Sequence, residues 1–154
     1  MEALGGRFAS ALGNLKLVTL DGPLGAGKTT LVRGLLHALG HHGTVKSPTF
    51  TLVEPYEIGS RRFYHFDLYR LNNPEELEFL GMRDYLVGSD LCVVEWAERA
   101  GRLLPAPDVA VMIAPANSAT ALGVALPPPS MESSGRDVTV TAHTPQGKTW
   151  LGGF

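Results

Sequence analysis

The sequence of 154 residues is poor in several features that would assign it to a class at once. It has one cysteine, Cys92, which excludes an intrachain disulfide and favours a reducing compartment. No apolar run approaches the roughly 20 residues that a membrane-spanning helix needs, and the N-terminus lacks the positively charged region of a signal peptide. We therefore expect a soluble, cytoplasmic protein with no membrane partner.

Charged side chains are scarce as well, at 18% of the sequence, and 13 basic residues against 15 acidic ones give a net charge of -2. Proteins that bind nucleic acid directly carry an excess of lysine and arginine, so we expect any RNA to reach this chain through a partner protein. Apolar residues, at 44%, are close to the usual share of a globular protein. This length and composition predict a single domain over residues 1–154.

The apolar pattern predicts helices and strands separated by glycine-rich and proline-rich turns. Leucines four residues apart indicate a helix over residues 28–39, which follows a buried strand over residues 15–20 and a glycine-rich loop. Two runs rich in aromatic and β-branched residues, 49–57 and 61–68, are joined by a short turn, as is typical of a hairpin. Further elements are expected as a helix at 3–12, a helix from Pro74 to Gly81, a helical turn at 97–104, and strands at 91–94, 109–113, 122–126 and 138–141.

The glycine-rich loop, Gly-Pro-Leu-Gly-Ala-Gly-Lys-Thr at residues 22–29, matches the P-loop pattern G-x-x-x-x-G-K-[ST] at every fixed position. In this motif backbone N–H groups surround the β-phosphate, and the N-terminus of the next helix adds positive potential. Lys28 would reach the β- and γ-phosphate oxygens, and the Thr29 hydroxyl is placed to ligate magnesium. The predicted nucleotide-binding residues of the loop are Gly22, Leu24, Gly25, Ala26, Gly27, Lys28, Thr29 and Thr30.

A buried strand, a P-loop and a helix in this order predict an α/β protein. We expect a P-loop NTPase-type fold with three layers, in which a mostly parallel sheet is flanked by helices. The hairpin and the C-terminal strands would extend that sheet in antiparallel fashion.

Two carboxylates are candidates for the acidic metal contact of such a site. Glu95 ends the apolar strand at 91–94 and has the better strand context, although an acid at a strand end is often only a solvated residue. Asp67 is more ambiguous, because it suits a metal or water contact, a helix cap or a partner for Arg70. Thr49 follows the P-loop helix, where a γ-phosphate sensor is often found, but an ordinary loop residue would look the same.

A mixture of charge and aromatic rings at residues 61–64, Arg-Arg-Phe-Tyr, leaves two interpretations open. Such a run can stack on RNA or dock a partner, or it can simply form the flank of a hairpin with a solvated tip. Arg99 and Arg102 suit either an arginine finger or a solvated surface.

Taken together, the motifs resemble the TsaE family of small P-loop ATPases, which is required for threonylcarbamoyladenosine (t6A37) modification of bacterial tRNA. Four segments carry the resemblance and occur in the family's order within residues 15–105: Leu24-Gly25-Ala26-Gly27-Lys28-Thr29-Thr30, Ser47-Pro48-Thr49-Phe50-Thr51-Leu52-Val53, His65-Phe66-Asp67-Leu68-Tyr69-Arg70-Leu71 and Glu95-Trp96-Ala97-Glu98. The chain departs from the family at Pro23, where aspartate is usual, and at Ala97, where proline is frequent.

The resemblance implies a role for each matched residue. Lys28 and Thr29 would hold phosphate and magnesium, and Glu95 would approach the magnesium ion. Thr49 and Asp67 would act in switch-like or water-positioning roles, so that the catalytic residues would be Lys28, Asp67, Glu95 and Thr49. Trp96 would lie beside the nucleotide.

The same resemblance implies that the cofactors are ATP and Mg²⁺. It also implies that the chain is an ATPase that is weak alone, and that its partners are homologues of the TsaD–TsaB transferase pair. A small-molecule kinase is an alternative, but it would need an arginine-bearing lid, and the sequence has no insertion of that kind. A GTP-dependent switch is a second alternative, although the guanine-reading pattern Asn-Lys-x-Asp is absent.

Overall fold

The computed structural model describes residues 1–88, 90–116 and 135–154. The helices are α1 (Glu2–Ser10), α2 (Lys28–Ala38), α3 (Glu76–Phe79), α4 (Met82–Gly88), the 3-10 helix η1 (Ala97–Leu103) and α5 (Pro145–Gly153). The strands are β1 (Leu17–Asp21), β2 (Val53–Ile58), β3 (Arg61–Asp67), β4 (Leu91–Glu95), β5 (Val109–Pro115) and β6 (Arg136–Ala142).

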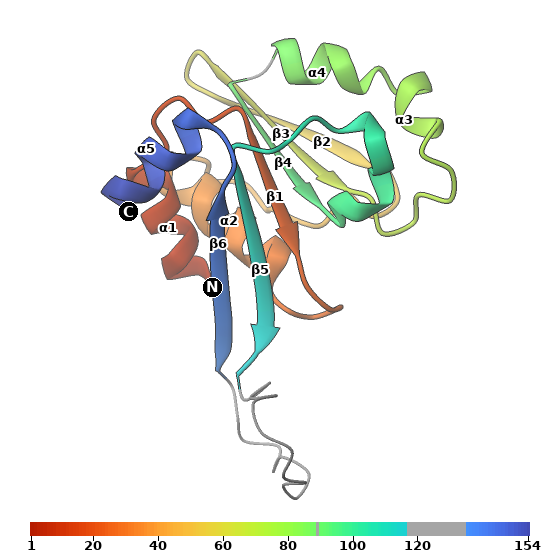
Figure 1. The fold of residues 1–154 in the computed structure, drawn as a ribbon. Coiled ribbons are helices and arrows are strands. Elements are labelled where there is room, and N and C mark those ends of the chain that lie inside the picture. Colours follow the sequence, from red (N-terminus) through yellow and green to blue (C-terminus); the bar gives the residue numbers. More distant parts are fainter. Residues whose placement is uncertain (89, 117–134) are drawn as a thin grey trace, which may run out of the picture.

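Within the described residues, the strands form one sheet in the order β2-β3-β4-β1-β5-β6 (Figure 1). β1 pairs in parallel with β4 and β5, and β3 pairs in parallel with β4. β2 and β6 add to the two edges in antiparallel fashion. The predicted fold class is therefore confirmed, and the carboxyl ends of β1, β3 and β4 meet at one end of the sheet, where α/β proteins place their sites.

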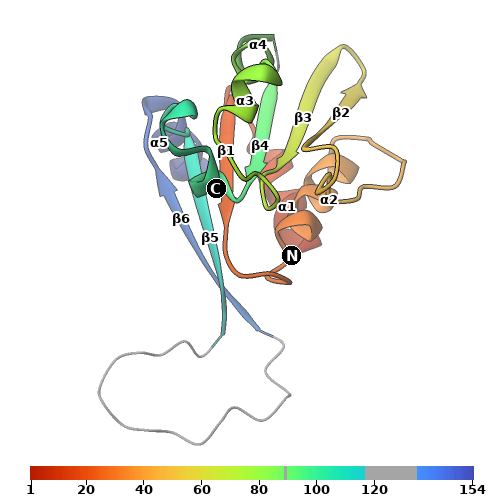
Figure 2. The same cartoon turned by 90° about the vertical axis from the view of Figure 1, so that its right-hand side faces the viewer.

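Helices cover both faces of the sheet, and each face has its own apolar core. In Figure 1, α3 and α4 lie across the sheet from α1 and α2, and Figure 2 shows the same separation from the side. The first core joins α1, α2 and α5 to the sheet and includes Phe8, Leu20, Leu31, Leu35, Val111 and Trp150. The second core joins α3, α4 and η1 to the other face and includes Leu17, Phe66, Leu77, Met82, Cys92 and Ala100.

The contact between α1 and α2 is close enough to bring the N-terminus beside the glycine loop. A Cβ atom on Gly34 of α2 would lie 2.1 Å from the Glu2 carbonyl oxygen, so only glycine fits at this crossing. A Cβ on Gly27 would likewise lie 2.8 Å from Cγ of Met1. The first residue of the chain is thereby held against the loop.

The secondary structure differs from the prediction at three places. The strand expected from residue 49 begins only at Val53, because a turn in which the Leu52 N–H donates to Pro48 O at 2.7 Å occupies the preceding residues. The helix expected between Pro74 and Gly81 is the shorter α3, which ends before Gly81 (φ of 76°) as predicted, but the helix α4 that follows was not predicted. The tail was expected to contain only strands, but it ends in α5.

The remaining expected elements occur within a few residues of their predicted bounds, except that the strand expected at 122–126 lies outside the described residues. In the part of the chain that the structure describes, none of the helices combines the length and the apolar character needed to cross a membrane.

Candidate functional site

The glycine loop connects β1 to α2 at the carboxyl end of the sheet. Gly22 leaves the strand with φ of 143°, and a Cβ there would lie 2.3 Å from the Ile113 carbonyl oxygen, so the residue must be glycine. Gly27 caps α2 with φ of 105°. The loop therefore folds back over the N-terminus of an 11-residue helix, whose unpaired N–H groups favour an anion.

Lys28 lies under this loop with only 4% of its surface exposed. Its Nζ donates to Gly22 O at 2.7 Å and to Pro23 O at 3.0 Å, and it stands 3.9 Å from the centroid of the Trp96 ring. Burial lowers the pKa of the Lys28 amine, while the nearby carboxylates, with Glu95 first, oppose this shift. The carboxylates favour the charged form of the amine, and a cation in a low-dielectric pocket attracts an anionic ligand strongly.

Glu95 connects the end of β4 to α2 and to β3. Its Oε1 accepts hydrogen bonds from Thr29 Oγ1 at 2.8 Å and from His65 Nε2 at 2.8 Å. Glu95 and His65 are almost completely buried, at 3% and 1% exposure. The strand order explains the meeting, because β4 lies between β3 and the strand that leads into the loop.

Asp67 is the register partner of Glu95 on the neighbouring strand and holds the segment after α2. Its Oδ2 accepts from Thr49 Oγ1 at 2.8 Å and from Ser47 Oγ, and the two hydroxyls lie 2.6 Å apart. Its Oδ1 accepts from the Tyr69 N–H at 3.0 Å. Thr49 and Asp67 are therefore in direct contact, although they are 18 residues apart.

A cavity of about 310 Å³ collects these groups at the loop. It is lined by Leu24, Gly25, Ala26, Gly27, Lys28, Thr29, Thr30, Ser47, Thr49, Asp67, Tyr69, Arg70, Glu95 and Trp96. Every site residue predicted from the sequence lines it except Gly22, which supports the loop from behind.

A second, more open cavity of about 490 Å³ shares the wall of the loop with the first. Gly25, Ala26, Gly27 and Thr30 line both cavities. The remaining walls come from the first turn of α1 and from β6, namely Met1, Leu4, Arg136 and Val138. A ligand with an anionic end in the first cavity would have room to extend into the second.

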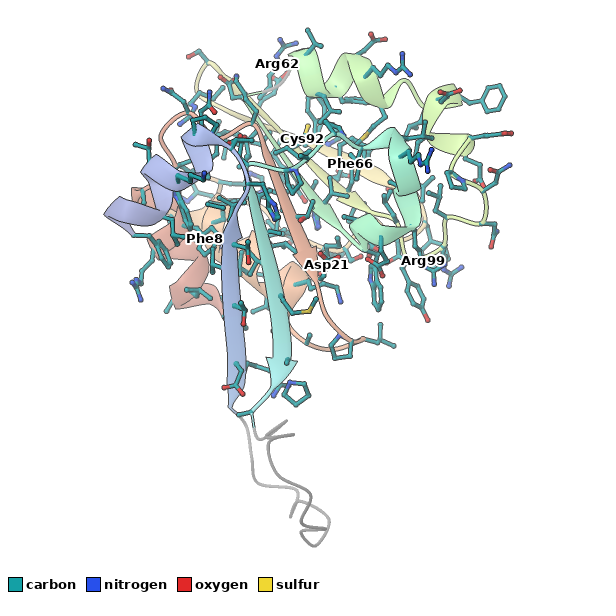
Figure 3. All side chains as sticks on the ribbon, in the orientation of Figure 1. Phe8, Asp21, Arg62, Phe66, Cys92 and Arg99 are labelled. Atoms are coloured by element: carbon teal, nitrogen blue, oxygen red, sulfur yellow. The ribbon has the colours of Figure 1, made fainter. Side chains whose placement is uncertain are left out.

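Asp21 is an acidic group at the end of β1 that sequence reasoning missed (Figure 3). Burial, and then the hydrogen bond and negative charge of Glu98, raise the pKa of the Asp21 carboxyl to about 6, against weaker opposing effects of the Ala97 N–H and Lys28. One oxygen of Asp21 is buried without a hydrogen-bond partner.

His65 and Ser47 were also missed as site residues. The period of a strand could have indicated His65, since residues 65 and 67 point to the same face of β3. Ser47 precedes Thr49 by two residues, and only the turn at residues 48–52 brings both hydroxyls to Asp67.

The oxygen donors of the site fit magnesium. Hydroxyl and carboxylate oxygens suit this ion, and the Thr29 hydroxyl and the Glu95 carboxylate are in direct contact beside the loop. Among the described residues no group of three or more His, Cys, Asp or Glu side chains could hold a metal ion by itself. A magnesium ion here would need phosphate and water oxygens to complete its octahedron, as is usual for this metal.

Comparison with known proteins places this arrangement in a family. The family model described as "Threonylcarbamoyl adenosine biosynthesis protein TsaE" matches residues 1–121. A tRNA threonylcarbamoyladenosine biosynthesis protein TsaE from Haemophilus influenzae is 52% identical over 118 residues, which cover 73% of this chain and 75% of that protein. The TsaE protein of Bacillus subtilis is 41% identical over 97 residues, covering 63% of this chain and 60% of the relative.

A solved structure agrees with the sequence relatives. The crystal structure of Bacillus subtilis YdiB superposes with a TM-score of 0.72 and 28% sequence identity, and the match covers 99% of this chain and 84% of YdiB. The family model covers most of the chain, including β1, the glycine loop, Asp67 and Glu95. The chain therefore belongs to the TsaE family of threonylcarbamoyl adenosine biosynthesis proteins.

Proposed function

We propose that this chain binds Mg-ATP and hydrolyses it slowly, and that homologues of TsaD and TsaB accelerate the reaction during t6A modification of tRNA. The observation that carries the proposal is the convergence of Lys28, Thr29 and Glu95 on one cavity at a P-loop. The membership of a family named for threonylcarbamoyl adenosine biosynthesis supports the tRNA pathway.

In this proposal the loop and Lys28 bind the phosphates. Lys28 Nζ now donates to two loop carbonyls, and it would exchange these neutral acceptors for β- and γ-phosphate oxygens. Thr29 and Glu95 would hold magnesium, which supplies positive charge to the phosphate oxygens during transfer. The partly buried site would strengthen these charge interactions.

Asp67, Ser47 and Thr49 would prepare the attacking water. The carboxylate of Asp67 already accepts from both hydroxyls on one oxygen, and the Tyr69 N–H fixes its other oxygen. A carboxylate held in this way can orient a water molecule, and a hydroxyl that leaves it can contact a γ-phosphate. This arrangement supports a water-positioning role for Asp67 and a sensing role for Thr49.

The second cavity offers a place for the nucleoside. It continues from Thr30 and the loop and is bounded by Arg136 and by the apolar side chains of Met1, Leu4 and Val138, which suit the polar edge and the faces of a base.

Partner dependence is supported by the arginines near the site. Arg70 lies 4.1 Å from the centroid of the Phe50 ring, and Arg99 donates to Leu71 O and lies over the Tyr69 ring. Both guanidinium groups are engaged with other groups of the chain. A partner that moves one of them, or supplies its own cation, would stabilise the transition-state charge and raise the rate.

Phosphate release from Mg-ATP by the chain alone, and with TsaD and TsaB homologues from the same organism, tests the proposal. We expect slow release alone and faster release with the partners. Lys28→Ala should reduce the rate by about 10³-fold, because it removes a cation aimed at the developing charge. Lys148→Ala, at an exposed position of α5, is the matched control and should keep the wild-type rate.

Two results would contradict the proposal. Wild-type turnover by Lys28→Ala would show that the hydrolysis does not occur at the P-loop. Phosphate transfer to a small acceptor, with no effect of the TsaD and TsaB homologues, would favour a kinase instead.

A further inference from the structure

His65 makes a contact that the proposed hydrolysis does not yet use. The residue lies on β3, where its register partner on β4 is Val93, two residues before Glu95. Alternation along the strands puts Val93 and Glu95 on the same face of the sheet as His65. The imidazole therefore lies between the apolar core beneath α2 and the carboxylate at the edge of the cavity.

The two donors to Glu95 Oε1 differ in what else they can do. Thr29 Oγ1 lies on the P-loop helix, and its hydroxyl is also the expected ligand of magnesium. His65 Nε2, at 2.8 Å, donates to Glu95 Oε1 and to no other group among the described residues. The Nε2 atom carries the hydrogen, because a carboxylate offers only acceptors. His65 is thus the donor dedicated to Glu95.

The second ring nitrogen shows what kind of role this is. His65 is 1% exposed, and its Nδ1 atom is buried without a hydrogen-bond partner. No group among the described residues lies within hydrogen-bond distance of Nδ1, so in this part of the chain the hydrogen bond that orients the imidazole is the one to Glu95.

The other carboxylate oxygen of Glu95, Oε2, takes part in neither of these hydrogen bonds. Within the described residues both hydrogen bonds to Glu95 end on Oε1, and the side chain lines the cavity. A carboxylate whose one oxygen is anchored can present the other in a single orientation. Outer hydrogen bonds of this kind orient metal ligands in many proteins, and their loss lowers metal affinity about 10- to 100-fold.

We infer that His65 is a positioning residue, whose Nε2–H anchors Oε1 of Glu95 so that Oε2 is directed into the magnesium subsite of the P-loop. The inference rests on the proposed Mg-ATP site. His65 acts through Glu95 and touches neither nucleotide nor metal.

The test compares nucleotide binding with magnesium and with EDTA, using a fluorescent ADP analogue. In His65→Leu, which has no donor, we expect the gain in affinity due to magnesium to fall about tenfold, while affinity in EDTA stays at the wild-type value. In His65→Gln, whose amide nitrogen can take the place of Nε2, the gain should stay within about threefold of wild type. Half-maximal hydrolysis should need about tenfold more magnesium in His65→Leu only.

Val93→Ala is the structural control, since it loosens the same face of the sheet beside His65 without removing a donor. It should lower the melting temperature and leave the magnesium effect intact. If His65→Leu does not fold, His65→Gln is compared with His65→Asn, whose amide reaches only the Nδ1 position and should not rescue. The ¹⁵N spectrum of wild-type His65 should show a protonated Nε2 and an unprotonated Nδ1.

The outcomes separate the inference from the proposed function. A wild-type chain whose nucleotide affinity ignores magnesium would overturn both. A wild-type magnesium effect that persists unchanged in His65→Leu, or that Val93→Ala reduces equally, would overturn the positioning role alone. A ¹⁵N spectrum with the proton on Nδ1 would also overturn it.

Discussion

Glu95 and Asp108 are both buried carboxylates, and they lie at opposite ends of the parallel strands. Glu95 ends β4, and its hydrogen bonds come from the side chains of Thr29 and His65. Asp108 directly precedes β5, and its Oδ2 accepts from the backbone N–H groups of Lys16 and Leu17 at 2.7 and 3.1 Å. The Glu95 carboxylate is therefore held by side chains, and the Asp108 carboxylate mainly by backbone N–H groups.

This difference indicates that Glu95 belongs to a ligand site and that Asp108 stabilises the fold. The hydroxyl that donates to Glu95 can turn to a ligand without moving the backbone, so the carboxylate is available for chemistry. The donors to Asp108 belong to the entry of β1, and Thr144 Oγ1 adds a bond of 2.5 Å from the cap of α5. Releasing Asp108 would therefore loosen β1, β5 and α5 together.

Glu95→Gln should produce the largest effect and should affect activity alone. The amide keeps an acceptor for Thr29 and His65 but loses the negative charge that favours magnesium. We expect phosphate release to fall by about 10²- to 10³-fold, while the free energy of unfolding changes by less than about 1 kcal/mol. Phosphate release and urea unfolding on the same sample test this, and a variant that loses stability but keeps its rate would contradict the comparison.

Asp108→Ala should show the reverse pattern. It removes the acceptor of three hydrogen bonds, of which the one from the Leu17 N–H is buried, and this should lower the free energy of unfolding by roughly 3 kcal/mol. The rate per folded molecule should stay at the wild-type value, because Asp108 is at the far end of the strands from the loop. Urea unfolding and phosphate release corrected for the folded fraction provide the measurement. Asp108→Asn, which keeps one acceptor, should lie between the two.

The sequence predicted the P-loop end of the sheet better than the Asp108 end, for a physical reason. Around residues 22–29 the local rules agree, because the glycines, the buried strand and the helix that follows all favour the same backbone. The position of Glu95 at the end of β4 could be predicted because the apolar run of residues 91–94 stops just before it. The parallel sheet then brought Asp67 beside Glu95 without any further signal.

The segments that were mispredicted depend on distant contacts. α5 contains three glycines at positions 147, 152 and 153, so its intrinsic helix propensity is low. It forms because Thr144 caps it and because Trp150 packs on Phe8 with ring centroids 4.6 Å apart. Leu52 has φ of 64°, a conformation that no pattern of Thr, Leu and Val would predict, and this turn places Thr49 in the site.

Thr144→Val should have a smaller effect at the Asp108 end of the strands. Valine keeps the shape of the side chain but removes the bond to Asp108 and the cap to the Gly147 N–H at 3.1 Å. We expect a loss of about 1 to 2 kcal/mol in the free energy of unfolding, with no change in phosphate release. Thr149→Val, at an exposed position of α5, is the control. An equal loss of stability in both variants would show that Thr144 contributes no more than another threonine of the helix.

The smallest expected effect is a pH dependence of the free energy of unfolding, which originates at Asp21 beside the glycine loop. The pKa of the Asp21 carboxyl is about 6 in the folded chain against 3.8 for the free group, mainly because of burial and Glu98. Between these two values the folded chain keeps a proton that the unfolded chain has lost. This group therefore makes the free energy of unfolding fall as the pH rises from about 4 to about 6, and adds no further slope above that.

Asp21→Asn does not titrate and should remove that part of the slope. Its side chain can still donate to Glu98, so the variant and the wild type should be equally stable near pH 4. At pH 8 the variant should be more stable by about 1 kcal/mol, a value reduced from the full shift because Asp21 is partly exposed to solvent. Urea unfolding at pH 4, 6 and 8 measures the difference, with Asp137→Asn on exposed β6 as the control. If the free energy of unfolding changed with pH in the same way in wild type and Asp21→Asn, burial would not disfavour the charged Asp21 carboxylate. The contrast between the two ends of the strands would then depend on Glu95 and Asp108 alone.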